Sequence, residues 1–250
     1  MHPFYQEEDL FPREFTHAIE RPWGVIYHNP DNPDSYDSNH ALIYRDRIEN
    51  LPAVLKEIAD FYLSRGGRPI IYQSILDDGW FGEIADDLAA AGYRSWQEAQ
   101  HWMLLDADSR ITAKADVRRV TAWTDDLAIH LYEAAGEPWE IAVAKRQLEN
   151  PNTLYFAAFA DDNPVGAIYG HVNYEGICRI DYLLVATAHR GKGLGRALTH
   201  AFVTHCREKA IPCALWPDGD TPERIYHEAG FRFVRTMMAG RASWKTDPSQ

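Results

Sequence analysis

The stretch His189-Arg190-Gly191-Lys192-Gly193-Leu194-Gly195-Arg196 decides the interpretation of this 250-residue chain. It follows a run of β-branched and aromatic residues and precedes apolar positions that recur at helical spacing. Glycines allow successive peptide N–H groups to converge on an anion, and the positive end of a helix dipole and three cationic side chains attract it. The stretch therefore predicts an anion-binding loop at a helix start, although alternating glycines also occur in plain flexible turns.

Two common nucleotide-binding patterns do not fit this loop. The Walker pattern requires four residues between its first glycine and Gly-Lys-Ser/Thr, and the chain lacks that spacing. The dinucleotide fingerprint requires glycine where Arg196 stands. We therefore expect a phosphate ligand of another kind.

The sequence around the loop predicts alternating strands and helices over the second half of the chain. The connections at 161–164 and 173–176 contain turn residues and are too short for crossovers, which predicts an antiparallel meander. The expected strands are 117–121, 154–160, 165–172, 177–185, 213–216 and 231–244. The expected helices are 125–135, 140–148, a helix from Leu194 to about 209–211, and 222–230.

The first half repeats the later part of this order. Strands are expected at 40–44, 68–74 and 93–105, with a helix over 51–63 capped by Asn50 and another over 80–91. Ala91-Gly92-Tyr93-Arg94 also echoes Ala229-Gly230-Phe231-Arg232. We predict tandem related domains, 1–113 and 114–250, the first truncated at its own start and carrying Arg45–Asn50 in place of the glycine loop.

The second half resembles the GNAT superfamily of acyl-CoA-dependent N-acetyltransferases. The resemblance rests on Leu184-Val185 at a strand end, on 190–195, and on Tyr226-His227-Glu228-Ala229-Gly230-Phe231, and it covers about residues 117–244. It implies an α/β (α+β) fold of tandem GNAT-like units, in which a mixed, mostly antiparallel sheet is flanked by helices. The first half would be a degenerate unit that binds no CoA.

The resemblance implies a binding mode for acetyl-CoA as co-substrate. The glycine loop would hold the pyrophosphate, and the pantetheine arm would lie as a pseudo-strand beside a strand that splays from its neighbour. The implied binding residues are Leu183, Leu184, Val185, Arg190, Gly191, Lys192, Gly193, Leu194, Gly195 and Arg196. The implied reaction is direct attack on the thioester by a primary amine of a small molecule or peptide.

Two residues are the leading catalytic candidates. Tyr226 matches the tyrosine with which the family protonates the departing thiolate, although a tyrosine there also suits a core. An alkyl ammonium has a pKa of about 10.4, so a base or a water chain is needed at neutral pH. Asp181 is the first candidate for that base, with Glu137, Glu140 and His171 as alternatives. The aromatic residues that could wall the acceptor pocket are Trp123, Trp139, Tyr169 and Tyr174.

Three departures from the family pattern keep other functions open. Gly219 and Pro222 stand where the family often has Asn and Ala, and the usual final strand is missing or merged into 231–244. A non-catalytic acyl-CoA-binding module with a partner-recruiting first half is therefore an alternative. A transferase for a longer acyl group is another.

Composition excludes several partner classes. The net charge of −12 is unsuited to nucleic acid, no apolar run reaches the roughly 20 residues of a membrane span, and the acidic start predicts a cytoplasmic protein. Residues 1–113 carry a net charge of −11, which would attract a cationic amine if that half faces the reaction, or would form a solvated surface. Cys178, Cys206 and Cys213 lack paired spacing, so we expect buried small hydrophobes, no disulfides and no metal.

Overall fold

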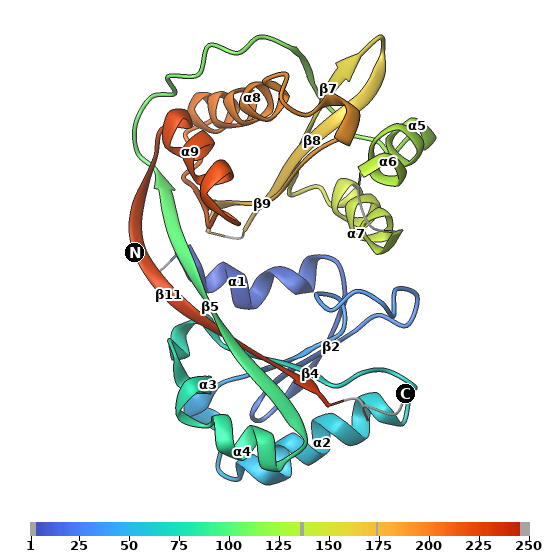
Figure 1. Cartoon of the computed structure of the whole chain (residues 1–250), viewed down its shortest axis with the longest axis vertical. Coiled ribbons are helices and arrows are strands. Elements are labelled where there is room, and N and C mark those ends of the chain that lie inside the picture. The colour runs from blue at the N-terminus through green and yellow to red at the C-terminus, as the bar shows by residue number, and fades with distance from the viewer. Residues whose placement is uncertain (1–3, 136–137, 174, 246–250) are drawn as a thin grey trace. The chain divides into compact units, whose positions relative to one another are not determined.

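The computed structural model describes residues 4–135, 138–173 and 175–245 (Figure 1). The chain forms two compact units. Unit 1 comprises Met1–Gln100 with Thr236–Gln250, and unit 2 comprises His101–Arg235. These divisions differ from the predicted domains 1–113 and 114–250 mainly because the end of the chain belongs to unit 1. The assignment of a degenerate and a catalytic domain stays a prediction.

Unit 2 contains the predicted meander. Adjacent strands from β6 to β9 pair antiparallel, and β9 pairs parallel with β10. The turn between β7 and β8 has positive φ at Asp161 and Asp162, a conformation that aspartate tolerates better than most side chains. The strands are β6 (Asp116–Arg119), β7 (Thr153–Ala160), β8 (Asn163–Val172), β9 (Cys178–Val185) and β10 (Cys213–Leu215).

Helices cover both faces of this meander (Figure 1). On one face, Phe156 of β7 packs in the same cluster as Leu198 and Phe202 of α8. On the other face, the neighbouring Tyr155 packs with Leu131, as the two-residue period of a strand requires. The helices are α5 (Asp125–Leu127), the π-helical turn η5 (Ala128–Tyr132), α6 (Glu133–Ala135), α7 (Pro138–Glu149), α8 (Leu194–Glu208) and α9 (Asp220–Ala229).

Unit 1 has a similar layout around its own core. Strands β1, β2 and β3 pair antiparallel, and β3 pairs parallel with β4. The strands are β1 (His17–Arg21), β2 (Gly24–His28), β3 (Ala41–Ile43) and β4 (Ile70–Gln73). The β1–β2 hairpin precedes β3 and was not among the predicted strands. The expectation that this half is truncated at its start stays a prediction.

The helices of unit 1 pack mainly on one face of its strands. Leu55 and Ile58 of α2 and Phe81 of α3 share a buried cluster with Ile43 of β3 and Ile71 of β4. The helical elements are α1 (Glu7–Leu10), α2 (Leu51–Leu63), α3 (Trp80–Glu83), α4 (Ala85–Ala90), and the short 3-10 turns η1 (Phe4–Gln6), η2 (Phe11–Glu14), η3 (Arg45–Arg47) and η4 (Ile75–Asp77).

Two long strands, β5 (Tyr93–Leu105) and β11 (Phe231–Trp244), each pair with a strand from the other half of the sequence. In unit 2, the end of β5 pairs antiparallel with β10, with Leu104 opposite Ala214. In unit 1, the end of β11 pairs antiparallel with β4, with Ala242 opposite Ile71. The strand that the second half lacks after 231–244 is therefore supplied by the first half.

The predicted fold class is confirmed, since both units are helix-flanked and mostly antiparallel. The repeat is visible in the two parallel pairs, β3 with β4 and β9 with β10, each joined by one helix. No helix within the described residues has the length and apolar character to cross a membrane.

Candidate active site

The strands β9 and β10 part soon after they meet. Their register covers only Cys178 with Cys213 and Arg179 with Ala214. Strand β9 continues to Val185, and within the described chain these further residues pair only with β8. The predicted binding residues Leu183, Leu184 and Val185 therefore lie where one edge of the strand has no strand partner. An extended ligand could pair with that edge as a strand does.

A β-bulge lies at the beginning of the parted segment. Tyr169 pairs with Tyr182 and Gly170 with Ile180, which leaves Asp181 as the extra residue. A Cβ at Gly170 would lie 2.2 Å from the Arg179 carbonyl oxygen, so only glycine permits this close approach. Bulges change the direction of side chains and are frequent next to active sites. The bulge thus falls on the residue predicted to act as the base.

The glycine loop follows β9 and a short 3-10 turn, η6 (Thr187–His189), and ends at the start of α8. Gly191 and Gly193 have φ values of +75° and +82°, which other residues rarely adopt. Gly193 is the N-cap of α8, and no side chain caps the helix. The first peptide N–H groups of α8 are therefore available to an anion, with the helix dipole favouring it.

Gly195 is not required by the packing of the protein itself. A Cβ there would meet only Ile225 at 3.8 Å and Leu183 at 4.0 Å, which are ordinary contact distances. Glycine near a helix start costs stability relative to alanine. Its presence is explained if a ligand approaches the backbone closely at this point.

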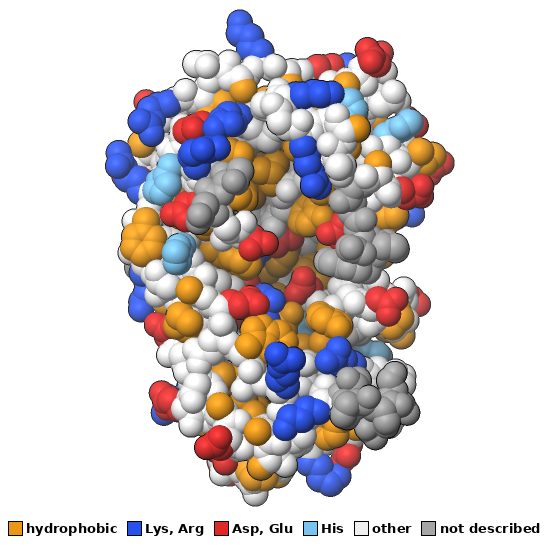
Figure 2. Space-filling view, in the orientation of Figure 1, with side chains coloured by type: hydrophobic (Ala, Val, Ile, Leu, Met, Phe, Trp, Pro, Cys, Tyr) orange, Lys and Arg blue, Asp and Glu red, His pale blue; other side chains and the backbone are white. Residues whose placement is uncertain are grey.

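The three cations of the loop have different surroundings. Arg190 Nε donates to the Val185 carbonyl oxygen at 3.0 Å, and Lys192 is exposed. Arg196 forms two hydrogen bonds with Glu228, at 2.7 and 3.1 Å, and its guanidinium holds the pKa of that carboxyl below its usual value. On the visible face of unit 2, Lys and Arg side chains gather over α8 and α9 (Figure 2). Lys192 is therefore better placed to meet a phosphate than Arg196, which is already paired.

The corresponding link in unit 1 has a side-chain cap at its helix start. The Asn50 side chain accepts a hydrogen bond from the Ala53 N–H at 3.1 Å and so caps α2. The Arg45 N–H donates to Asp77 at 2.8 Å, and the Arg45 guanidinium pairs with Glu83. These groups are occupied within the protein, and that this half binds no CoA stays a prediction.

Tyr226 lies on α9 with its side chain buried in the core of unit 2. Its ring packs edge-on against Phe231, with 5.8 Å between the ring centroids. Burial, and next the neighbouring Cys213, raise the pKa of Tyr226 well above that of a free tyrosine. The phenol therefore stays protonated at neutral pH, as a proton donor must. Gly219, which replaces the asparagine frequent in the family, is the N-cap of α9 with φ +91°.

Asp181 forms an ion pair that sequence reasoning missed. Arg179 Nη1 lies 2.5 Å from Asp181 Oδ1, and the side chains are 6% and 20% exposed. The pattern of alternation could have suggested this pairing, because residues two apart share a face of a strand. The carboxylate predicted as base is thus held by a buried cation.

Glu140 lies beside the same strand. Its carboxylate accepts a hydrogen bond from the Tyr182 hydroxyl, and Tyr182 stacks on Tyr169 with 5.3 Å between ring centroids. Of the other proposed bases, His171 is buried on β8, and Glu137 lies outside the described residues. Asp181 and Glu140 both act electrostatically on Tyr169. His171 lies opposite Arg179 in the β8–β9 pair and is buried.

The aromatic residues predicted around the acceptor are only partly brought together. Tyr169 lies between Tyr155 and Tyr182 in a stack, with 5.4 Å to the Tyr155 ring centroid. Trp123 stacks instead on Tyr132. Tyr174 lies outside the described residues, as does the side chain of Trp139.

A parted strand followed by an uncapped glycine loop is the arrangement that the sequence resemblance implied for the second half. A model of the acetyltransferase (GNAT) family matches residues 120–231. Residues 120–231 are a GNAT acetyltransferase domain. This membership supports acyl transfer as the chemistry of the GNAT domain, and the matched segment ends at Phe231, the last residue of the predicted tyrosine motif.

Solved structures share the fold over most of the chain. A GCN5-related N-acetyltransferase from Kribbella flavida has 14% identity, a TM-score of 0.66, and coverage of 99% of this chain and 98% of its own. A conserved protein of unknown function from Staphylococcus epidermidis has 16% identity, a TM-score of 0.60, and coverage of 93% and 95%. A tandem GNAT protein from the clavulanic acid biosynthesis pathway has 14% identity, a TM-score of 0.55, and coverage of 83% and 76%. No curated protein matches the chain.

Proposed function

We propose that this protein transfers an acetyl group from acetyl-CoA to a primary amine of a small molecule or peptide. The observation that carries the proposal is the uncapped helix start at Gly193, placed directly after the unpaired edge of β9. A phosphate group and an extended amide chain can both be bound there by backbone groups. CoA contains both features in one molecule.

In the proposed complex, the pyrophosphate accepts hydrogen bonds from the first N–H groups of α8, and Lys192 adds positive charge. The pantetheine amides pair with the edge of β9 over Leu183–Val185. This places the thioester near the bulge at Asp181, where a strand N–H can polarise its carbonyl group. Binding by backbone groups explains why small residues occupy the loop.

The reaction requires three proton transfers. The acceptor ammonium first loses a proton to Asp181 or Glu140, directly or through water. The neutral amine attacks the thioester carbonyl carbon, the C–S bond breaks, and Tyr226 gives its proton to the CoA thiolate. The amide nitrogen then loses its second proton, which returns to Tyr226 through water. Both carboxylates lie near Tyr169 and Tyr182, since each contributes to the electrostatic surroundings of the two phenols.

The same residues favour a cationic acceptor. The carboxylates of Asp181 and Glu140 attract an ammonium group by charge. The guanidinium of Arg179 forms an ion pair with one of these carboxylates, 2.5 Å from Asp181. An acceptor ammonium would compete with the guanidinium for Asp181, so Arg179 would set how strongly amines bind. Dependence on acetyl-CoA is also in keeping with the cytoplasmic location expected from the sequence.

A screen of amines with the full-length protein tests the proposal. Purified protein is incubated with acetyl-CoA and a panel of mono- and polyamines and amino-terminal peptides, with thiol release and acetylated product followed together. We expect acetylated product from at least one amine class, and its loss in Gly193→Asp. Tight CoA binding without product from any amine would instead favour the non-catalytic acyl-CoA-binding module. Faster turnover with a longer acyl-CoA would show that the longer acyl-CoA, and not acetyl-CoA, is the preferred donor.

A further inference from the structure

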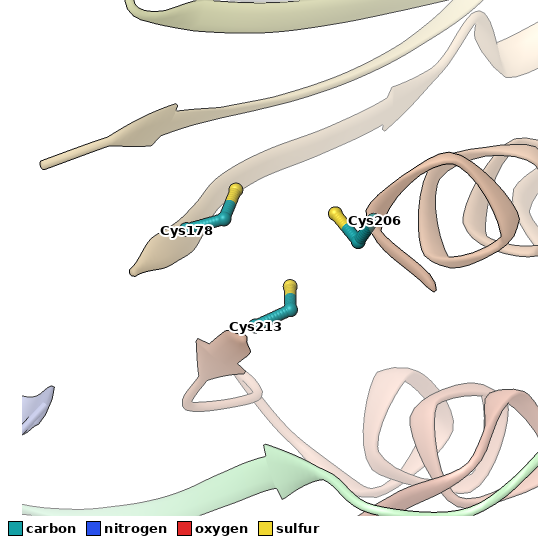
Figure 3. Close-up of side chains that lie close together, drawn as sticks. All are labelled: Cys178, Cys206 and Cys213. Carbon is teal, nitrogen blue, oxygen red and sulfur yellow. The ribbon is translucent and has the colours of Figure 1, made fainter. Parts of the chain in front are cut away.

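Three cysteine side chains converge in unit 2. Cys178 and Cys213 are the first residues of β9 and β10 and are register partners in the parallel pair. Cys206 comes from the last part of α8. Figure 3 shows their sulfur atoms directed toward a common centre, and the three Sγ atoms all lie within 4.8 Å of one another. The sequence spacing gave no indication of this group, because its members come from three different elements.

The cluster lies in a fully buried position. All three side chains have 0% exposure and pack within the core of unit 2. Within the described residues, no His, Asp, Glu or fourth Cys joins the group. A site with three sulfur donors and no oxygen or nitrogen donor is selective for soft metal ions.

We propose that Cys178, Cys206 and Cys213 bind one Cu(I) ion. A metal–sulfur distance of about 2.3 Å in a trigonal arrangement corresponds to sulfur separations of roughly 4.0 Å. The observed separations of up to 4.8 Å require movements of less than an ångström to reach this geometry. Zn(II) fits less well, because structural zinc sites use four ligands and this cluster offers three.

The thiols can supply the negative charge that the ion requires. Each sulfur that binds as a thiolate releases one proton to solvent, and the metal is neither oxidised nor reduced in this step. Thiolate coordination thus exchanges protons for the metal ion without any further reactant.

The short connection between α8 and β10 is hydrogen-bonded to the backbone of two of the three cysteines. The Cys178 N–H donates to the Pro212 carbonyl oxygen, and the Ile211 N–H donates to the Cys206 carbonyl oxygen, each at 2.8 Å. Ala210 in this connection has φ +54°, a left-handed conformation that is unfavourable for alanine. Local opening of 209–212 would break the four backbone hydrogen bonds that join these residues to Cys178, His205, Cys206 and Arg207, and is the route by which the ion would enter.

Anaerobic titration of the reduced, full-length protein with Cu(I) in the presence of a chromophoric Cu(I) chelator tests the site. We expect one ion per chain to be withdrawn from the chelator, with the ultraviolet charge-transfer absorption of a copper–thiolate bond and a raised melting temperature. Failure of the folded wild-type protein to compete with the chelator would overturn the proposal. Binding of Zn(II), but not Cu(I), through the same thiols would overturn the choice of ion.

Variants separate a metal site from simple core packing. Cys178→Ser, Cys206→Ser and Cys213→Ser should each weaken Cu(I) binding by about 100-fold or more, since loss of even an outer-shell partner costs 10–100-fold. Val203→Ala, which truncates another buried residue of α8, should keep full affinity. Equal Cu(I) affinity in the wild-type protein and a folded serine variant would contradict the proposal. Should a serine variant fail to fold, Cys206→Ala provides the same comparison.

Discussion

The links β3–α2 and β9–α8 have the same order of elements, but only the first has a side-chain cap at its helix start. Each joins the first strand of a parallel pair to the helix that crosses to the second, and each contains a short 3-10 turn. In unit 1 the Asn50 side chain caps the helix, whereas in unit 2 Gly193 leaves it uncapped. The two links therefore share their order of elements, and the proposed anion site differs from its counterpart in unit 1 by the absence of a side-chain cap.

The difference also has an energetic side. A side-chain cap typically stabilises a helix by about 1 kcal/mol. Unit 2 lacks this contribution at α8 and carries three glycines in the loop before and at the start of the helix. A bound phosphate would restore the missing hydrogen bonds. We expect acetyl-CoA to stabilise unit 2 and leave unit 1 unaffected.

Gly193→Asp should give the largest effect on CoA binding. The carboxylate would stand beside the pyrophosphate, and two like charges 4 Å apart repel by about 4 kcal/mol near a protein surface. We therefore expect the affinity for acetyl-CoA, measured by calorimetry, to fall by about 100-fold or more.

Gly193→Asn is the matched control for charge. Asparagine has the same shape as aspartate and tolerates the left-handed conformation that Gly193 adopts, with φ +82°. Its affinity should lie between those of the wild-type protein and Gly193→Asp. Unchanged affinity in both variants would remove the anion site from this helix start.

Tyr226→Phe should lower turnover by about 100-fold, since general acid catalysis contributes at least that much. Its affinity for acetyl-CoA should change little, because the proton is transferred only in the transition state. Single-turnover rates and calorimetry separate the two effects. A wild-type single-turnover rate in this variant would leave Tyr226 as a core residue only.

Gly195→Ala should separate binding from stability. Its Cβ has room, with Ile225 at 3.8 Å as its nearest neighbour, and alanine is the better helix former by up to about 1 kcal/mol. Thermal unfolding should therefore occur at an equal or higher temperature, while acetyl-CoA binds about tenfold more weakly. Reduced stability together with unchanged affinity would show that Gly195 serves packing.

Asn50→Ala should have the smallest effect on function. It removes the cap of α2 and should cost about 1 kcal/mol of stability. Acetyl-CoA affinity and turnover should equal those of the wild-type protein, as followed by denaturant unfolding and steady-state kinetics. A loss of CoA affinity without unfolding would mean that unit 1 contributes to cofactor binding.

Local patterns predicted much of this architecture. The glycine loop, the antiparallel meander and the helix over 51–63 are local features, and the structure contains them at or near the predicted residues. The β1–β2 hairpin was missed although Val25-Ile26-Tyr27 is a typical strand sequence, because its partner β1 is mostly polar and exposed. Short strands are specified by their neighbours more than by their own pattern.

Long-range pairings could not be predicted from local patterns. The pairing of β5 and β11 with the other half of the sequence depends on which strand lies beside β10, and no periodicity encodes this. The Arg179–Asp181 ion pair follows from strand alternation, but the convergence of three cysteines does not. The roles assigned to Asp181 and Tyr226 stay predictions.

Equilibrium dialysis of the full chain against labelled acetyl-CoA tests the comparison of the two helix starts most directly. The account predicts one molecule bound per chain, none in Gly193→Asp over the same concentration range, and one in the double variant Asp46→Asn, Glu49→Gln, which removes two carboxylates from the link of unit 1. Two molecules bound by the wild-type chain, or one that persists in Gly193→Asp, would contradict the claim that the uncapped start of α8 is the CoA site.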